Sequence, residues 1–206
     1  MDPNQIKGTE GYEKCVEEFV TATLSINFFD LHKDFLSFFP KSKSIVLDLG
    51  AGIGRDASHL FKMGYTVIAV EPLKEFRSKG SSLYSLDKII WIDDSLPELS
   101  ELKEYDNRFD FILASGVWHH LNGKEQSISI GRISELLKPN GIFALSLRNG
   151  PAGVGTQVFS TDSNRTVELA SKFGLLNLLL LENQPSLMKN KKEVTWSRLV
   201  FQKSKV

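Results

Sequence analysis

The amino-acid sequence predicts a single-domain, doubly wound α/β fold with a mostly parallel sheet. From Ser44 onward, short runs rich in Val and Ile alternate with segments of helical spacing, a pattern typical of strand–helix–strand units. A glycine-rich turn directly follows the first of these runs. With 206 residues, of which 41% are hydrophobic and 24% charged, the chain can bury one core with helices on both faces of a sheet.

Seven runs are expected to be strands, and the first five are short and apolar, as buried strands are. They are Ser44–Leu49, Thr66–Val70, Lys88–Ile92, Phe109–Ala114, Gly141–Leu147, Leu175–Leu181 and Thr195–Gln202. The polar link between the last two, Glu182–Val194, has no helical spacing. Because a parallel return usually needs a helical crossover, the last two strands are expected to pair antiparallel, as a hairpin at the sheet edge.

Helical spacing fills the stretches between the predicted strands. The predicted helices are Asp56–Met63, Leu73–Ser82, a weak turn near Leu96–Lys103, Gln126–Leu137 and about Asn164–Phe173. Asn122, with Glu125 three residues later, has the pattern of a capping box, and Pro139-Asn140-Gly141 is expected to end the helix before the fifth strand.

The first 43 residues are expected to stand apart from the core of residues 44–206. Apolar residues at helical spacing predict two amphipathic helices, near Tyr12–Leu24 and Phe28–Phe39, and Pro40 ends the second. Within a single domain of residues 1–206, residues 1–43 are therefore predicted to form a helical cap or lid.

Composition and charge exclude several classes of protein. Cys15 is the single cysteine, which excludes an intrachain disulfide and a cysteine-based metal cage, so a reducing cytoplasm is expected. Lys plus Arg and Asp plus Glu number 25 each, so no overall positive field attracts nucleic acid or a membrane. The polar first residues lack the pattern of a signal peptide, and no apolar run approaches the roughly 20 residues of a membrane span. The expected partner is a small molecule, and the expected assembly is a monomer or homodimer.

Charge is nonetheless unevenly distributed along the chain. Residues 93–110 hold seven acids against two bases, and residues 186–206 hold six bases against one acid. Patches of this kind are usually solvated faces. Lys189, Lys191 and Lys192 fall in the predicted hairpin loop and are too few to indicate an RNA site.

Four consecutive predicted strands are followed by residues suited to ligand binding. The first leads into Asp48–Asp56, where glycines in a GxGxG register let the backbone approach a ligand. Glu71 follows the second strand and can accept hydrogen bonds from both hydroxyls of a ribose. Asp93 and Asp94 follow the third strand, and residues 115–121 follow the fourth. Taken alone, the glycines also fit a structural tight turn and Glu71 a solvated strand end, but these strand ends share the edge where ligands of open α/β folds bind.

Together, five segments resemble the motifs of class I S-adenosylmethionine-dependent methyltransferases, from about Ser44 to the C-terminus. VLDLGAGIGRD resembles the first motif, VIAVEP the second, WIDDSLPEL the third, FDFILASGVWHHL the fourth and LLKPNGIFALSLRNGP the fifth. More narrowly, the chain is similar to a bacterial subgroup of small methyltransferase-domain proteins with VWxHL and SLRxGP segments. The resemblance implies a seven-stranded Rossmann-like sheet, S-adenosyl-L-methionine as cofactor and S-adenosyl-L-homocysteine as product.

The resemblance also implies which residues bind this cofactor. The glycines of the first motif are expected against its methionyl and ribose parts, Glu71 at the ribose, and residues 94–96 around the adenine. The full set of expected contacts is Asp48, Gly50, Ala51, Gly52, Gly54, Arg55, Glu71, Pro72, Asp94, Ser95, Leu96, Ser115 and Tyr12.

Polar side chains after the fourth and fifth strands are candidates for the acceptor side. His119 or His120 can take a proton from the acceptor, since imidazole titrates near neutrality. The alternative is that one of the pair, preferentially His120, packs beneath the following helix. Arg148, next to Asn149, can bind an acceptor carboxylate through both arms of its guanidinium. The alternative for Arg148 is a salt bridge to a nearby acid.

Two aromatic side chains complete the predicted acceptor pocket. Trp118 is a candidate wall of this pocket, although a tryptophan at this position suits the core equally. Tyr12 is a candidate for closing over the methionyl end of the cofactor, although a surface tyrosine fits the same pattern.

No motif identifies the methyl acceptor. The (N/D)PP(Y/F) tetrapeptide of amino-methylating relatives is absent after the fourth strand, where ASGVW stands, which argues against adenine or glutamine as acceptor. No cluster of His, Cys or carboxylate residues has metal-ligand spacing, so no metal is expected.

The resulting hypothesis is methyl transfer from S-adenosylmethionine to a small-molecule acceptor, through an undetermined N, O, S or C atom. The alternative is a non-catalytic module that binds S-adenosylmethionine or a partner. A nicotinamide-dependent oxidoreductase is a third hypothesis. Arg55, at the place of the third glycine of the GxGxxG fingerprint, and the Asp93-Asp94 pair argue against it.

Overall fold

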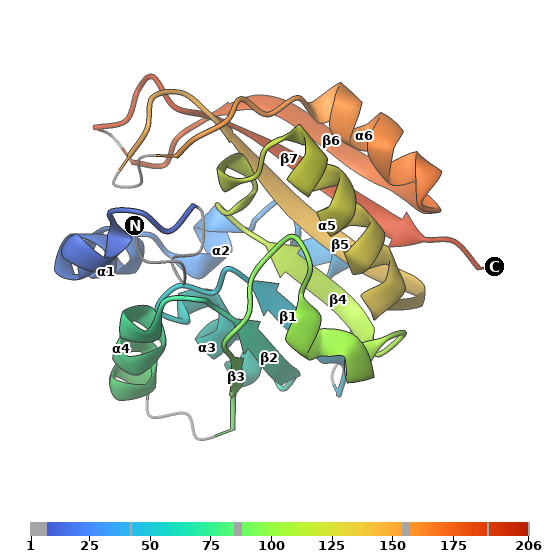
Figure 1. The fold of residues 1–206 in the computed structure, drawn as a ribbon, viewed down its shortest axis with the longest axis horizontal. Helices are drawn as coiled ribbons and strands as arrows, with labels where there is room; N and C mark the ends of the chain where they lie inside the picture. The colour runs from blue at the N-terminus through green and yellow to red at the C-terminus, as the bar shows by residue number, and fades with distance from the viewer. Residues whose placement is uncertain (1–7, 42, 85–87, 154–156, 189, 206) are drawn as a thin grey trace.

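The computed structural model describes residues 8–41, 43–84, 88–153, 157–188 and 190–205. A seven-stranded sheet has the order β3-β2-β1-β4-β5-β7-β6 (Figure 1). The strands are β1 Ile45–Leu49, β2 Thr66–Val70, β3 Ile90–Ile92, β4 Phe109–Ala114, β5 Leu137–Asn149, β6 Leu175–Pro185 and β7 Thr195–Lys203. Strands β1 to β5 pair in parallel, and β7 pairs antiparallel with both β5 and β6. The predicted mostly parallel sheet and its antiparallel C-terminal hairpin are confirmed.

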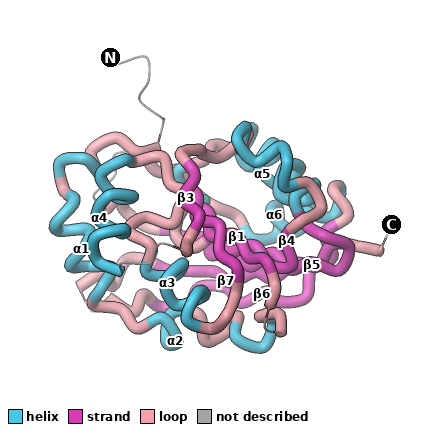
Figure 2. The backbone as a smooth tube through the Cα atoms, turned by 90° about the horizontal axis from the view of Figure 1, so that it is seen from below, coloured by secondary structure: helices cyan, strands magenta, loops and turns pink. Residues whose placement is uncertain are grey.

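Helices lie on both faces of this sheet, with α5 and α6 on one face and α2 and α3 on the other (Figure 2). The helices are α1 Val16–Leu24, α2 Phe28–Leu31, α3 Arg55–Lys62, α4 Lys74–Tyr84, α5 Gly123–Leu136 and α6 Ser163–Lys172. Short 3-10 turns are η1 Tyr12–Lys14, η2 Leu36–Phe38, η3 Ser100–Tyr105 and η4 Trp118–His120. The helices predicted between the strands are present with shifted ends. None of the helices among the described residues combines the length and apolarity needed to cross a membrane.

The start of α5 follows the prediction, and its end differs from it. The Asn122 side chain accepts from the backbone N–H of Lys124 and Glu125, while the Glu125 carboxylate accepts from the Asn122 N–H, so the capping box is confirmed. Strand β5 begins at Leu137, directly after α5, rather than at Gly141. The Pro139–Gly141 turn forms an irregularity within β5. The pairing of β5 with β4 shifts register there, between Leu137 and Ile142.

The predicted helix over Phe28–Phe39 is wrong. Only the short α2 and the 3-10 turn η2 form in this stretch. Phe28 and Phe35 are fully buried, and Phe39 packs edge-on against Phe111 of β4 at 4.8 Å between ring centroids. A continuous helix would present its aromatic residues along one stripe, whereas the bent chain brings them onto the sheet. This stretch is therefore a layer of the core.

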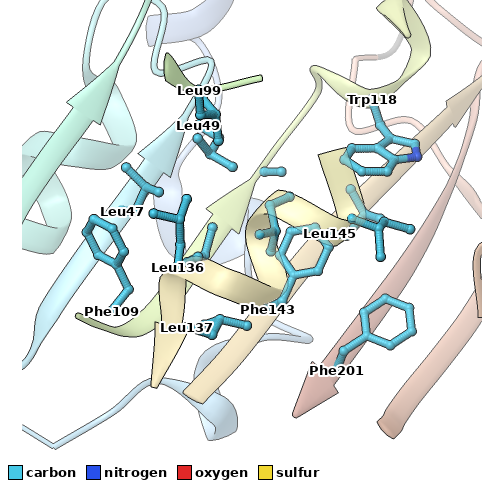
Figure 3. Packing of buried hydrophobic residues seen from close by; sticks show 14 of the residues in the cluster. Leu47, Leu49, Leu99, Phe109, Trp118, Leu136, Leu137, Phe143, Leu145 and Phe201 are labelled. Carbon is cyan, nitrogen blue, oxygen red and sulfur yellow. The ribbon is translucent and has the colours of Figure 1, made fainter. Parts of the chain in front are cut away.

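Two apolar layers enclose the sheet. One lies beneath α5 and α6 and includes Leu47, Leu49, Phe143 and Phe201 (Figure 3). The other lies beneath the N-terminal segment and α3, and Val46 of β1 faces it. Successive residues of β1 thus point to opposite faces, as a strand buried on both sides requires.

Candidate functional site

A pocket of about 720 Å³, counted with its open mouth, lies at the carboxyl ends of β1 to β4. The N-terminal segment and α4 contribute the remaining walls. The lining residues are Gly8, Thr9, Tyr12, Phe19, Leu49, Gly50, Gly52, Val70, Glu71, Pro72, Leu73, Phe76, Asp94, Ser95, Leu96, Gly116, Val117, His120 and Leu121.

The glycine turn after β1 presents its backbone to this pocket. Gly50 and Gly52 have φ values of 65° and 56°, a conformation that side chains other than glycine rarely adopt. A Cβ atom on Gly50 would stand 2.9 Å from the Val117 side chain. The turn therefore requires glycine at both positions and leaves main-chain atoms, rather than side chains, at the pocket wall.

Glu71 is fixed beside this turn by two backbone donors. Its Oε2 accepts from the N–H of Gly52 and its Oε1 from the N–H of Leu73, each at 2.9 Å. The residue is only 5% exposed. Burial raises the pKa of Glu71 to about 7, although these two hydrogen bonds oppose the shift. Each carboxylate oxygen retains acceptor capacity toward the pocket.

The acidic residues after β3 stabilise a turn. The Asp94 carboxylate accepts from the N–H of Ser95 at 2.7 Å and from the N–H of Glu101 at 2.8 Å. Asp93 pairs with Arg77 of α4. Asp94, Ser95 and the following residue line the pocket as predicted. In the described part of the chain, no three His, Cys, Asp or Glu side chains converge as metal ligands would.

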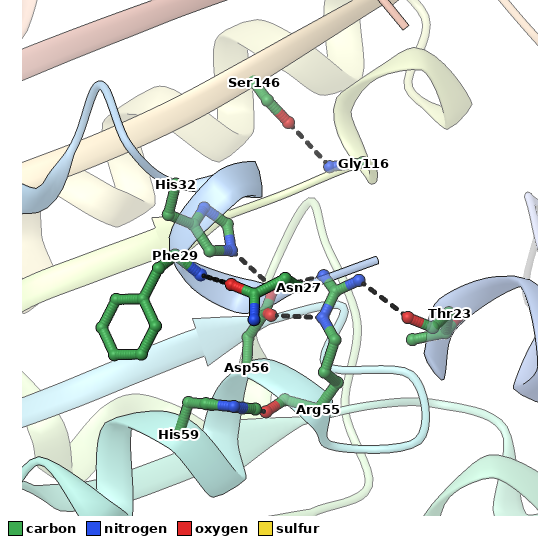
Figure 4. A network of polar contacts seen from close by, with 9 residues as sticks. All are labelled: Thr23, Asn27, Phe29, His32, Arg55, Asp56, His59, Gly116 and Ser146. Atoms are coloured by element: carbon green, nitrogen blue, oxygen red, sulfur yellow. Dashed lines mark hydrogen bonds and ion pairs between the residues drawn. The ribbon is translucent and has the colours of Figure 1, made fainter. Parts of the chain in front are cut away.

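Several residues predicted to contact the cofactor lie outside the pocket lining. Arg55 holds the Asp56 carboxylate with Nε at 2.7 Å and Nη2 at 3.0 Å, and its Nη1 donates to the Thr23 carbonyl at 3.3 Å (Figure 4). His32 Nε2 lies 3.0 Å from Asp56 Oδ2. These contacts join the N-terminal segment to α3 behind the glycine turn. Asp48 is buried in the same region, and burial raises the pKa of its carboxyl.

The other predicted cofactor contacts absent from the lining are Ala51, Gly54 and Ser115. Ser115 is replaced there by Gly116, whose N–H donates to the Ser146 hydroxyl at 2.9 Å (Figure 4). Gly54 is the N-cap of α3, in the left-handed conformation. The three glycines of the motif therefore have two different roles. The first two line the pocket, and the third is the residue at which α3 begins.

Tyr12 and His120 meet in the wall of the pocket that the N-terminal segment and the turn after β4 form. The Tyr12 hydroxyl lies 3.2 Å from His120 Nε2, and His120 Nδ1 lies 2.8 Å from the Gln157 carbonyl oxygen. Because a carbonyl oxygen only accepts, Nδ1 carries the proton and Nε2 accepts from the Tyr12 hydroxyl. Burial lowers the pKa of His120 and raises the pKa of Tyr12. The pocket therefore contains a neutral imidazole with its Nε2 lone pair held by a single hydroxyl.

Of the two histidines predicted as candidates for the acceptor side, His120 lines the pocket and His119 does not. His119 is 5% exposed, and its Nδ1 is buried without a partner among the described residues. Burial lowers the pKa of His119 to about 2. The alternative that one histidine of the pair packs in the interior, for which His120 was preferred, therefore applies to His119. The 3-10 turn η4 explains this arrangement, since successive side chains of such a turn point about 120° apart.

The structure places two predicted substrate contacts away from the pocket. Trp118 is fully buried in the core, 6.1 Å from Phe143 between ring centroids, so the prediction that it walls the pocket is wrong. The Asn149 amide donates to the Thr161 carbonyl and accepts from the Thr161 N–H, both at 2.9 Å. Asn149 therefore closes the loop after β5.

Arg148 lies near Tyr12 and His120, and its charge acts on both groups. It is 6% exposed, and it donates to the carbonyls of Gly150 and Pro151 at 3.4 and 2.5 Å. No described carboxylate lies within ion-pair distance of Arg148, so the alternative of a salt bridge is not found among the described residues. Burial lowers the pKa of its guanidinium, and its positive charge opposes the rise of the Tyr12 pKa.

An aromatic wall of the pocket was not predicted. Phe19 of α1 stacks on Phe76 of α4 at 4.4 Å between ring centroids, and Tyr12 lies edge-on to both rings. The spacing of Tyr12 and Phe19 on one helical face was a visible signal for burial. The partner of that face was not visible, because α4 is distant in the sequence.

The sequence model of the family described as "Methyltransferase domain" matches residues 26–188 of this chain. A stretch of 98 residues is 30% identical to an uncharacterised methyltransferase of Geobacillus sp. (strain WCH70), and 100 residues are 35% identical to phosphoethanolamine N-methyltransferase 1 of Triticum aestivum. These stretches cover 48% and 47% of this chain, and 44% and 20% of the two relatives. The chain thus spans under half the length of these curated relatives.

The fold is similar to that of a solved enzyme, the 1,6-didemethyltoxoflavin-N1-methyltransferase of Burkholderia thailandensis. The TM-score is 0.65, with 18% identity, over 99% of this chain and 93% of that chain. At this identity the likeness establishes the shared fold.

Proposed function

We propose, from the premise that this chain belongs to the class I S-adenosylmethionine-dependent methyltransferases, that it methylates a small polar or anionic molecule. One observation carries the proposal. One pocket is lined both by the glycine turn with Glu71, called the cofactor end, and by the Tyr12–His120 pair, called the acceptor end. The first set of residues suits the cofactor of this family, and the second suits an acceptor that must lose a proton.

The cofactor end fits S-adenosylmethionine in its donor and acceptor groups. Glu71, already positioned by two backbone N–H groups, is proposed to accept from both ribose hydroxyls. The backbone at Gly50 and Gly52 is proposed to lie against the methionyl part, and Ser95 and Leu96 against the adenine. Asp48 and Arg55 are proposed to support the turn from behind.

When bound, S-adenosylmethionine supplies a methyl group on a sulfonium, which is already an activated electrophile. The protein must then align the acceptor and exclude water. Residues 8–24 are proposed to act as the lid that does so, because Tyr12 and Phe19 line the pocket. Arg55 binds the Thr23 carbonyl and Lys79 pairs with Glu17 at 2.7 Å, so both ends of α1 are tied to the core.

His120 is proposed to take the proton of the acceptor through Tyr12, whose oxygen accepts that proton while its own hydroxyl proton passes to His120 Nε2, 3.2 Å away. Its lowered pKa keeps the imidazole unprotonated near neutral pH, as a base requires. The Gln157 carbonyl holds the Nδ1 proton, which fixes the tautomer and stabilises the imidazolium that would form. Tyr12 holds the ring at Nε2 and closes the pocket.

The names of the relatives support a small acceptor. The wheat protein is a phosphoethanolamine N-methyltransferase, and the Burkholderia enzyme was crystallised with 1,6-didemethyltoxoflavin and S-adenosylhomocysteine. Both acceptors are small nitrogen compounds. Arg148 is buried near Tyr12 and has no carboxylate partner in the described part of the chain, which supports a negative charge on the acceptor.

The test has two stages. Calorimetry with S-adenosylmethionine, S-adenosylhomocysteine and NAD should detect binding of the two sulfur compounds and none of NAD, because the pocket offers no pyrophosphate site. A radiolabelled methyl-transfer screen should then begin with small acidic amines and continue with acids, phenols and thiols. Cofactor binding without transfer to any class would favour the non-catalytic module, and absence of binding by folded protein would overturn both.

A further inference from the structure

A second hollow lies beside the acceptor end of the pocket. It has about 720 Å³ with its open side included, and residues of the loops that follow β5 and β6 form its walls. Its charged residues are Arg148, Lys191, Lys192 and Glu193, so three cations face one acid. Neither lysine lines the cofactor pocket, and neither has a part in the proposed methyl transfer.

Arg148 is the buried part of this hollow. Among the described residues, two carbonyl oxygens accept from its guanidinium, those of Gly150 and Pro151, and both are uncharged. Burying a cation without an anion costs free energy. A planar guanidinium matches a carboxylate or phosphate in shape and charge. The site therefore has the chemistry of an anion receptor.

The hollow adjoins the groups proposed to handle the acceptor proton. The charge of Arg148 acts on both Tyr12 and His120, and that of Lys191 acts on His119, in each case after the larger effect of burial on the pKa. Lys191 Nζ also lies over Gly153, 3.5 Å from where a Cβ atom there would stand. Arg148 is thus within electrostatic reach of Tyr12 and His120, the pair proposed to take the acceptor proton.

We infer that this hollow holds the acidic group of the methyl acceptor, a phosphate monoester or a carboxylate, while the nucleophilic atom faces His120. The inference rests on the proposed function and narrows its substrate class. The acceptor would carry its charge on one end and its nucleophile on the other, because the two sites are adjacent rather than identical. Glu193 at the rim disfavours an acceptor with a second negative charge on that side.

The first test measures anion binding directly and does not need an acceptor. Folded protein saturated with S-adenosylhomocysteine is titrated with inorganic phosphate, with acetate and with uncharged glycerol, and the backbone amide signals of Gly150 and Gly153 are followed by NMR. Phosphate or acetate should shift these signals and glycerol should not. The anion with the lower dissociation constant indicates whether the site prefers phosphate or carboxylate.

A matched pair of variants controls for overall charge. Lys191→Gln with Lys192→Gln removes two charges from the hollow, whereas Lys103→Gln with Lys172→Gln removes two from exposed lysines on η3 and α6. The first should weaken anion binding by about tenfold, and the second should change it by less than about twofold. Equal effects of the two variants, or no shift at Gly150 and Gly153, would overturn the inference.

The second test uses methyl transfer with acceptors that share one amine and differ in carrying a phosphate, carboxylate or hydroxyl end. The hollow variant should raise KM for the acidic acceptors by about tenfold and leave the hydroxyl analogue unchanged. If acidic and hydroxyl acceptors are methylated with equal KM, the hollow does not bind the acidic group of the acceptor, while the proposed methyl transfer stands. If no acceptor is methylated, the proposed function fails, and the NMR titration still decides the hollow.

Discussion

The two ends of the pocket are built in different ways. At the cofactor end, residues that directly follow β1, β2 and β3 meet because parallel strands place their carboxyl ends on one edge. At the acceptor end, Tyr12 meets a histidine 108 residues later, and Gln157 completes the contact from a third segment. The first end follows from the sheet, whereas the second depends on loops and on the N-terminal segment. Changes at the acceptor end should therefore alter function without unfolding the protein.

The largest effect is expected from truncating the N-terminal segment, which tests whether the acceptor end can be altered without unfolding the sheet. Deletion of residues 1–26 removes Tyr12 and Phe19 but keeps Phe28 and Phe35, so transfer should be abolished and cofactor binding weakened while the sheet stays folded. Deletion of residues 1–39 should unfold the chain, because loss of a buried phenylalanine costs about 3–5 kcal/mol. Circular dichroism and calorimetry distinguish the two truncations. Full activity in the shorter truncation would show that residues 8–24 are not a lid.

His120→Ala should lower kcat by about 10² to 10⁴, the usual contribution of a general base. The loss should shrink as pH rises, because the acceptor then deprotonates without help. His119→Ala is the matched control, since its side chain is buried outside the pocket. It should lower the free energy of unfolding and leave kcat within about twofold. Equal kcat losses in both variants would assign the effect to packing.

The histidine pair shows where prediction from sequence reached its limit. The strands with their antiparallel C-terminal hairpin, the glycine turn, Glu71 and the segment after β3 were predictable, because each follows from strand patterns and from the geometry of parallel sheets. Which histidine faces the pocket was not predictable, because it depends on the rotation of a three-residue turn. Trp118 was likewise ambiguous, since an aromatic residue after a strand suits both a pocket wall and a core.

The N-terminal segment shows a second limit. Phe28, Phe35 and Phe39 have helical spacing, yet their burial against β4 breaks the helix after α2. Local spacing predicts a helix only where one stripe of the helix can bury all its apolar residues, and here tertiary packing favoured a bent chain. Residues 1–7 of the predicted cap lie outside the described residues.

At the cofactor end, Glu71→Ala should weaken binding of S-adenosylhomocysteine by about 1–3 kcal/mol, which is the cost of losing hydrogen bonds to a charged acceptor. Glu75→Ala, an exposed carboxylate on the neighbouring turn of α4, is the control and should leave binding unchanged. Calorimetry measures both. If Glu71→Ala binds with full affinity, the carboxylate does not contact the ribose.

Arg148→Lys should act at the acceptor end alone. It keeps the positive charge and loses the planar fork, so KM for an acidic acceptor should rise by about tenfold, equivalent to one charged hydrogen bond. The dissociation constant of S-adenosylhomocysteine should not change, because Arg148 lies outside the cofactor pocket. A parallel loss of cofactor affinity would mean that Arg148 supports the whole cleft rather than the acceptor.

The smallest expected effect is the pH dependence of cofactor binding, which we expect to follow the ionisation of Glu71. Burial raises the pKa of its carboxyl to about 7 in the free protein, so the protonated form predominates below that pH. Two ribose hydroxyls are better bound by the ionised form, because it offers acceptors only. Cofactor affinity should therefore increase by about threefold between about pH 6.5 and 7.5 and level off above, following the ionised fraction.

Stability of the free protein should change in the opposite direction. A carboxyl whose pKa is raised by folding contributes stability below its unfolded pKa, and this contribution is lost as pH rises through about 7. Glu71→Gln should remove both trends while preserving the shape of the side chain. Calorimetry of S-adenosylhomocysteine binding and chemical unfolding, each at matched pH values, provide the measurements. Identical pH slopes in the wild-type protein and Glu71→Gln would assign the titration to another group, and the raised pKa of Glu71 would then have no part in cofactor binding.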